Sequence, residues 1–229
     1  MEFKVVLPEE NLLLRELPED VVVARDPLWD SLRGGDYSAF ETVFKKHYTF
    51  LFNYGLKLNR DEEEVKDCIQ TLFLTIWERR AFLGASDSIR NYLLASLRRL
   101  ILKRMKMAFS HVELDDDNSE FFIELSAESH MIYDQTLAEN VAMVQAAVSC
   151  LPDRQKEALY LKFYSEQSFG DIAKIMNIST RAVYKLIYKA LDSLNAELSP
   201  RLGAKPSFSS LLITLMSSGL PLLETIFFA

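Results

Sequence analysis

Apolar residues recur at intervals of three and four along most of the chain, and this helical spacing constrains the fold more than any other feature. Only 7 of the 229 residues are Gly and 7 are Pro, which argues against a loop-rich or all-β protein. The spacing therefore predicts an all-α protein. The expected helices span residues 37–58, 61–82, 88–108, 138–150, 153–164, 168–176 and 180–197.

Charge is divided along the chain far more sharply than the net charge of −7 suggests. Residues 79–106 carry eight basic side chains against one acidic one, whereas residues 111–134 carry eight acidic side chains and no Lys or Arg. This contrast is typical of a nucleic-acid-binding surface beside a solvated linker. The linker also contains the apolar patch FFIEL, which is a candidate docking segment with no partner indicated.

These patterns predict two small helical domains joined by an acidic linker. The expected divisions are an N-terminal extension (1–27), a first helical domain (28–110), the acidic linker (111–137), a second helical domain (138–198) and an apolar C-terminal tail (199–229). In the extension, VVV (21–23) fits either a short strand or an extended arm. The tail has 18 uncharged residues from Pro206 to Leu223, but its five serines, Gly219 and Pro221 favour a packed or partner-binding tail over a membrane span.

The segment FGDIAKIMNISTRAVYKLIYKALDSL (169–194) predicts a helix-turn-helix, because a short helix, a three-residue turn and a second helix follow one another. Ala173 is small where the helices approach, Asn177 tolerates the positive φ of the turn, and Ser179 is placed as an N-cap. A core shared by both helices is expected from Ile172, Met176, Ile178 and Val183.

The second helix of this motif has two distinct faces. Its apolar face is expected to hold Val183, Ile187, Ala190, Leu191 and Leu194. The opposite face holds Arg181, Lys185, Tyr188 and Lys189. Three cations and a tyrosine on an exposed face favour insertion into a DNA major groove over a merely solvated lysine-rich helix.

Two earlier helices also have faces that favour binding. In residues 89–106 the expected buried stripe is Leu93, Leu97, Leu100, Ile101 and Met105. The outer face carries Tyr92, Ser96, Arg99, Lys103 and Lys106, a combination that suits single-stranded or opened DNA.

In residues 61–80 the expected core stripe is Val65, Ile69, Leu72, Phe73 and Ile76. Leu74 falls on the polar face near Trp77, which indicates either a protein-docking patch or a helix buried on two sides.

No catalytic, metal or cofactor site is expected. The chain has no phosphate-binding G-x-x-x-x-G-K-S/T sequence and no nucleophile motif. The run Asp115–Asp117 lacks calcium-loop spacing, and the three histidines, His47, His111 and His130, stand apart from plausible ligands. Two distant cysteines and an N-terminus without a basic region and apolar run predict a cytoplasmic protein without a signal peptide.

The combination of these motifs resembles the extracytoplasmic-function (ECF, group 4) RNA polymerase sigma factors of the sigma-70 family. Residues 36–106 resemble sigma region 2, with AFETVFKKHY (39–48), DCIQTLFLTIW (67–77) and IRNYLLASLRR (89–99). Residues 141–197 resemble sigma region 4, with CLPDRQKEALYLKFYSEQSFGDIAKIMNISTRAVYKLIYKAL. A helix-turn-helix alone is widespread, whereas its pairing with D-x-x-Q-x-x-F-x-x-x-W is specific.

The resemblance implies a non-enzymatic subunit that binds core RNA polymerase and directs it to promoters, without a cofactor or a small-molecule substrate. Region 2 would melt the −10 element with the loop 82–88 and with Tyr92, Ser96, Arg99, Lys103 and Lys106. Region 4 would read the −35 element with Ser179, Thr180, Arg181, Lys185, Tyr188 and Lys189. The polymerase clamp would contact Asp67, Gln70, Phe73, Leu74 and Trp77, and an anti-sigma factor is a further expected partner.

Three features depart from the family pattern. Thr71 stands where many relatives have an acidic residue, and Leu186 stands where many have Arg, so one clamp contact and the promoter preference do not carry over. The apolar tail after residue 206 lies outside the two-domain pattern, and binding an anti-sigma factor, folding back or modulating polymerase binding all remain open. Two alternatives to a sigma factor are a helix-turn-helix regulator that acts independently of polymerase core and an interaction protein that does not bind DNA.

Overall fold

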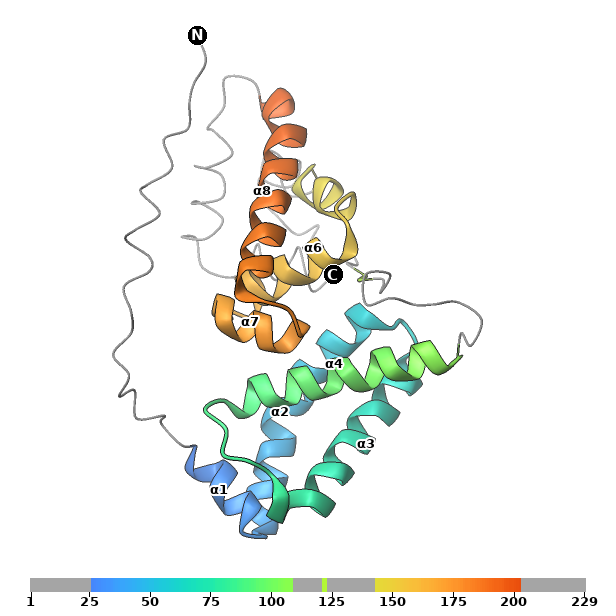
Figure 1. Ribbon diagram of the computed structural model, residues 1–229. Coiled ribbons are helices and arrows are strands. Elements are labelled where there is room, and N and C mark those ends of the chain that lie inside the picture. The colour runs from blue at the N-terminus through green and yellow to red at the C-terminus, as the bar shows by residue number, and fades with distance from the viewer. Residues whose placement is uncertain (1–25, 109–120, 123–142, 203–229) are drawn as a thin grey trace, which may run out of the picture.

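The computed structural model describes residues 26–108, 121–122 and 143–202, and all regular secondary structure in these residues is helical (Figure 1). The expected all-α class is confirmed. The elements are α1 (Pro27–Arg33), α2 (Tyr37–Leu58), α3 (Glu62–Arg79), the 3-10 turn η1 (Arg80–Phe82), α4 (Ile89–Ala108), a helix at residues 143–149, α6 (Asp153–Leu159), the π-helical turn η4 (Tyr160–Tyr164), α7 (Phe169–Met176) and α8 (Thr180–Leu202).

The first unit consists of α1–α4, with α2, α3 and α4 packed on one another and α1 against α2. An aspartate N-cap begins each of the first three helices; Asp61, for example, accepts hydrogen bonds from the backbone N–H groups of Glu63 and Glu64. Helices α2 and α3 approach closely at Gly55, where an added Cβ would lie 2.5 Å from Val65 Cγ1. The apolar stripes of these helices form the core.

Helix α1 was not expected from the sequence, although Asp26-Pro27 is an N-cap followed by proline at the first helical position. It buries Trp29, which is 1% exposed and donates from Nε1 to the Gly84 carbonyl at 3.0 Å. Arg33 Nε donates to the Leu83 carbonyl at 2.8 Å. Helix α1 therefore anchors the loop that precedes α4.

The second unit consists of residues 143–202 and contains the expected helix-turn-helix in α7 and α8. Asn177 adopts the left-handed conformation at φ 55°, and Ser179 Oγ accepts from the Ala182 N–H at 3.2 Å, so both turn predictions are confirmed. The helix expected at 153–164 is instead α6 followed by the π-helical turn η4. Helix α8 extends to Leu202, beyond the expected end at residue 197.

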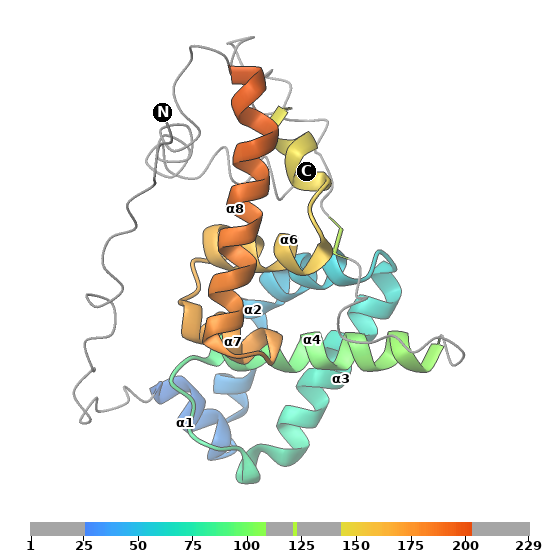
Figure 2. The ribbon, with the colours of Figure 1, turned by 45° about the horizontal axis from the view of Figure 1, so that its top comes forward.

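The two units are packed together, with α7 lying against α4 and α8 projecting away from the first unit (Figures 1 and 2). Among the helices of the described segments, none combines the length and apolar character that crossing a membrane requires. The expectations for residues 1–25, for most of the acidic linker and for the apolar tail fall outside the described residues.

Candidate DNA-binding and protein-docking surfaces

The exposed face of α8 brings together the residues expected to contact duplex DNA. Arg181, Lys185 and Lys189 are exposed, and the Tyr188 side chain is 56% exposed. Ser179 and Thr180 are exposed where the helix begins, although Ser179 also serves as its N-cap. The opposite face packs in the core as expected, with Val183, Ile187, Ala190 and Leu194 buried and Leu191 partly buried. The N-terminal half of α8 thus presents a cationic ridge.

An aromatic stack that sequence reasoning missed orients Tyr188. Phe169 of α7 stacks on Tyr184 with ring centroids 4.0 Å apart, and Tyr184 lies nearly parallel to Tyr188 at 6.3 Å. Lys162 Nζ lies 4.7 Å from the Phe169 ring centroid and closes the other end of the stack. The i, i+4 spacing of Tyr184 and Tyr188 was the available sequence signal. The stack fixes one face of Tyr188 and leaves the rest of the side chain available.

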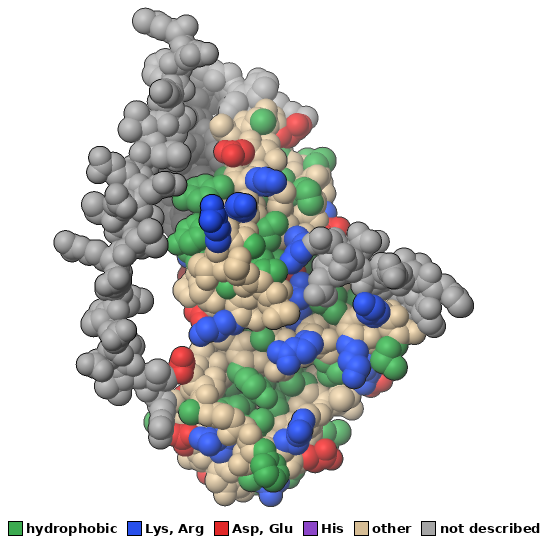
Figure 3. Space-filling view, viewed as in Figure 1, with side chains coloured by type: hydrophobic (Ala, Val, Ile, Leu, Met, Phe, Trp, Pro, Cys, Tyr) green, Lys and Arg blue, Asp and Glu red, His purple; other side chains and the backbone are tan. Residues whose placement is uncertain are grey.

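The outer face of α4 carries the second expected DNA surface. Arg99, Lys103 and Lys106 are exposed, while Ser96 and Tyr92 are partly buried. The Tyr92 ring packs on Trp29 with centroids 5.1 Å apart, so one side of that ring is already covered. Figure 3 shows Lys and Arg side chains along α4 and again over the lower part of α8. On the inner side Leu93, Leu97 and Ile101 are buried as expected, whereas Leu100 and Met105 are only partly buried.

Three arginines of α4 point away from that basic face and have structural roles. Arg104 donates to Glu64 Oε1 at 3.0 Å and to Thr71 Oγ1 at 2.9 Å, which ties α4 to α3. Arg90 lies 3.7 Å from the Phe50 ring centroid, and Arg98 is 3% exposed. Fewer of the eight basic side chains in residues 79–106 are therefore available to bind nucleic acid than the sequence suggests.

The exposed part of α3 forms an apolar patch bordered by polar groups. Leu74 is 62% exposed, Asp67 and Gln70 are exposed beside it, and Trp77 is partly buried. Tyr37, which sequence reasoning missed, is 66% exposed and packs edge-on against Trp77 at 5.7 Å. Phe82, at the end of η1, is also exposed. We call Tyr37, Leu74 and Trp77 the α3 patch.

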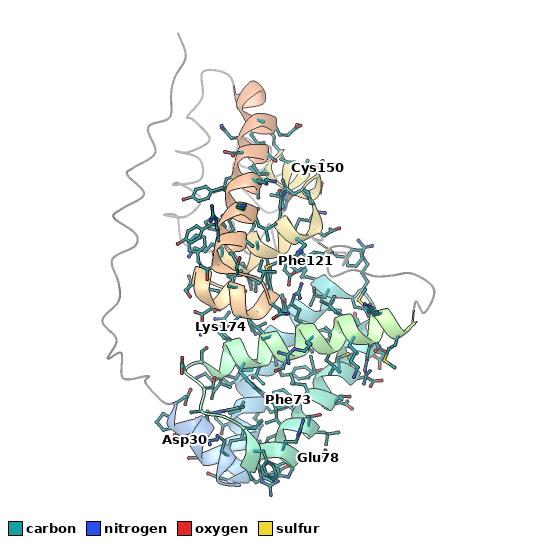
Figure 4. All side chains as sticks on the ribbon, in the orientation of Figure 1. Asp30, Phe73, Glu78, Phe121, Cys150 and Lys174 are labelled. Carbon is teal, nitrogen blue, oxygen red and sulfur yellow. The ribbon has the colours of Figure 1, made fainter. Side chains whose placement is uncertain are left out.

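Phe73 is a correction to the expected contact surface. Its side chain is only 3% exposed and packs edge-on against Phe44 at 4.9 Å and Phe40 at 5.9 Å. Figure 4 shows Phe73 directed into the interior of the first unit. Because it follows the core stripe of α3, it supports the α3 patch from below and is not available for a surface contact.

In the part of the chain that the structure describes, no three His, Cys, Asp or Glu side chains gather where they could hold a metal ion. His47 is 8% exposed, and burial together with the nearby charges of Lys46 and Arg90 lowers its pKa from the ordinary 6.5. Asp115–Asp117 lie outside the described segments.

Comparisons with known proteins identify both units. Residues 43–108 match the family model for sigma-70 region 2, and residues 142–194 match the model for sigma-70 region 4. Together the two matches span just over half of the chain. A search of curated proteins finds no match.

Two solved structures share the fold at low sequence identity. One, at 17% identity and a TM-score of 0.50, is CnrH in complex with the cytosolic domain of CnrY; the match covers 76% of this chain and 96% of that one. The other, at 17% identity and a TM-score of 0.51, is the sigma factor RpoE in complex with the anti-sigma factor NepR from Bartonella quintana; it covers 70% of this chain and 96% of that one.

Proposed function

We propose, from the premise that this chain belongs to the sigma-70 family of RNA polymerase sigma factors, that it is a member of the ECF (group 4) branch. As a sigma factor the chain acts in transcription initiation, with core RNA polymerase and promoter DNA as its partners. Sigma factors are regulatory and non-enzymatic. The ECF assignment is supported by the presence of regions 2 and 4 alone among the matched regions, joined by a short acidic linker.

Three surfaces divide the work in this proposal. The exposed face of α8 reads the −35 element, the outer face of α4 and the loop 82–88 engage the opened −10 element, and the α3 patch with Asp67 and Gln70 docks on polymerase. The observation that carries the proposal is that the cations on the outer faces of α4 and α8 and the Leu74 side chain of α3 are exposed within the residues that the two family models match. A helix-turn-helix regulator without a sigma role would leave the α3 patch unexplained.

We also propose the cytoplasm as the location and an anti-sigma factor as a regulatory partner. The solved structure of RpoE with the anti-sigma factor NepR supports this partner class, since that protein shares the fold. The two domains of the proposal correspond to residues 28–110 and 138–198.

The direct test is binding to purified core RNA polymerase followed by run-off transcription from a library of genomic fragments. We expect stoichiometric binding and discrete new start sites. Tight duplex binding without polymerase binding would instead support the independent regulator.

Leu74→Asp tests the docking surface. A charge in the middle of an exposed apolar contact should weaken core binding by about 2 kcal/mol, roughly thirtyfold. Thr75→Asp is the matched control, because it adds the same charge at the next exposed position of α3. Equal binding by the two variants, with unchanged helicity, would remove the α3 patch from the proposal.

A further inference from the structure

A buried polar network joins region 2 to region 4. Arg98 of α4 donates to both carboxylate oxygens of Glu157 in α6, from Nε to Oε1 at 2.8 Å and from Nη2 to Oε2 at 3.1 Å. The Tyr54 hydroxyl of α2 donates to Glu157 Oε1 at 2.6 Å. The exposed fractions of Tyr54, Arg98 and Glu157 are 0%, 3% and 1%, so the pair is shielded from solvent.

An aromatic side chain of the linker seals this network. Phe121 is 2% exposed and lies between Tyr54 of region 2, at 6.5 Å between ring centroids, and Tyr160 of region 4, at 5.7 Å. Figure 4 places Phe121 at the junction of the two units. The next residue fixes the backbone there, because the Phe122 N–H donates to the Lys57 carbonyl at 2.7 Å. We call Tyr54, Arg98, Phe121, Glu157 and Tyr160 the clasp.

The chemistry of the clasp favours one arrangement of the units over all others. A buried ion pair adds little net stability, but removing one partner leaves an uncompensated buried charge and is strongly destabilising. Burial and the charge of Glu157 raise the pKa of Tyr54 well above its ordinary value, so its hydroxyl stays protonated and donates. Tyr54, Arg98 and Glu157 are therefore paired with one another while regions 2 and 4 are together, and separating the regions exposes all three to water.

This arrangement fixes the position of one DNA-binding surface relative to the other. In helix-turn-helix complexes the first helix crosses the DNA backbone beside the recognition helix. Here that first helix, α7, lies against α4 of region 2. Duplex DNA bound along α8 would therefore pass close to region 2. The clasp leaves the α8 face exposed, and its effect is therefore on the spacing of the two DNA surfaces rather than on their exposure.

The linker anchor further restricts that spacing. With residues 121–122 held on α2, only residues 123–142 separate the anchor from region 4, and they span at most about 70 Å when fully extended. Released from the anchor, residues 109–142 span up to about 120 Å. Detaching Phe121 and breaking the ion pair both increase the reach of region 4.

We propose that the clasp holds the free sigma factor in a closed state and that opening it is a required step in binding polymerase and promoter. The inference about opening rests on the proposed function, whereas the closed state itself does not. On opening, Phe121 leaves its place between Tyr54 and Tyr160, and Arg98 separates from Glu157. An anti-sigma factor that binds the closed state would act through the same equilibrium.

The closed state is tested by measuring the distance between two spin labels on the full chain. One label goes on the native exposed Cys150, and the other on Glu78→Cys at the exposed end of α3 (Figure 4). Burial raises the pKa of the Cys68 thiol to about 11, so Cys68 stays unlabelled at neutral pH. We expect one narrow distance distribution in the otherwise unchanged chain.

Two single substitutions should open the clasp. Phe121→Ala changes a residue outside the helices of both regions, and Phe82→Ala is its matched control because that ring is 88% exposed. Glu157→Gln removes the buried charge, with the exposed Asp192→Asn as its control. Both clasp variants should give longer and broader distances, and both controls should resemble the unsubstituted chain.

A triple substitution separates loss of the clasp from loss of folding. Replacing Tyr54, Arg98 and Glu157 together by Phe, Met and Leu exchanges the three polar side chains of the network for apolar ones and leaves neither charge of the ion pair buried alone, so it should restore the narrow distribution. A broad distribution in the unsubstituted chain would overturn the closed state, and an unchanged one in Phe121→Ala would overturn the role of Phe121 in maintaining it. If Glu157→Gln loses helicity, the distance distribution of Phe121→Ala tests the clasp instead.

Affinity for core polymerase tests the functional part. A competent state populated at about 10% lowers apparent affinity about tenfold, so Phe121→Ala should bind core polymerase up to about ten times more tightly. Unchanged affinity in an open variant would show that opening is not required for binding. Absence of core binding in every variant, with the distances as expected, would reject the proposed function and leave the closed state standing.

Discussion

Phe73 and Leu74 are adjacent in α3 and meet opposite environments. Phe73 is 3% exposed among the rings of Phe40 and Phe44, whereas Leu74 is 62% exposed. A helix turns about 100° per residue, so neighbours commonly fall on different faces. The helical pattern already placed Phe73 in the core stripe, and only the family motif placed it at the polymerase surface. A motif gives residue types, and the direction of each side chain comes from packing.

We expect Phe73→Ala to act on stability. Removing a buried ring that contacts two other rings should lower the free energy of unfolding by about 3–5 kcal/mol. Urea unfolding followed by circular dichroism measures this loss. Leu74→Ala is the comparison, because truncating an exposed side chain should change stability by less than about 0.5 kcal/mol. Similar losses in the two variants would contradict the buried position of Phe73.

His47 gives the stability of region 2 a dependence on pH. Its folded-state pKa lies below the ordinary 6.5 because burial, Lys46 and Arg90 oppose its charge, with Asp26 acting weakly the other way. Below pH 6.5 the unfolded chain therefore binds more protons than the folded one, and stability falls as the pH falls towards the folded pKa.

We expect His47→Leu to remove this part of the pH dependence. Thermal melting from about pH 8 to about pH 5 should show a shallower decline in the variant, since only groups other than His47 still titrate. Parallel curves for the two proteins would indicate that His47 titrates alike when folded and unfolded.

At the level of helices, α4 performs several tasks with different faces. Arg99, Lys103 and Lys106 face solvent, Arg104 binds α3, and Arg98 binds region 4. Helical periodicity predicted the long helices and most of their buried stripes, because burial repeats with the period of the helix. It did not predict α1, whose seven residues are too few for a periodic signal. The sequence also contains no local sign of the π-helical turn after α6.

Lys185→Ala tests α8 as a reader of duplex DNA. If Lys185 neutralises a phosphate, its loss should weaken promoter binding and reduce the slope of log affinity against log salt by about one. Filter binding or fluorescence anisotropy of the polymerase complex over a salt series measures this slope. Lys45→Ala, an exposed lysine on α2, serves as the control and should leave the slope unchanged.

Trp29→Phe tests the contact between α1 and the loop before α4. The variant lacks the indole N–H that donates to the Gly84 carbonyl, a loss of about 1 kcal/mol. Hydrogen exchange should therefore become faster in residues 83–88 while remaining unchanged in α8. If this loop helps to open the −10 element, run-off transcription should fall with core binding unchanged. Unaltered exchange in the loop would show that α1 does not hold it.

For the molecule as a whole, the sequence predicted the two units but not their contact. Arg98 and Glu157 are 59 residues apart, and neither belongs to a local pattern that indicates a partner. Arg98 lies between the buried and the basic stripes of α4, so periodicity alone left its direction open. The apolar patch FFIEL indicated docking without identifying a partner, and Phe121 of that patch is buried. The pairing of Arg98 with Glu157 was not predicted, because it depends on how helices from the two units pack against each other.

The mixed chemistry of the clasp also makes it sensitive to temperature. Burial of aromatic rings such as Phe121 weakens on cooling, because the hydrophobic effect does. The cost of removing the Arg98–Glu157 pair from water falls on warming, because hydration of charged groups becomes less favourable. Both contributions to the stability of the clasp therefore become less favourable on cooling. Below the melting temperature of either region, a cold solution is the condition in which regions 2 and 4 separate most readily.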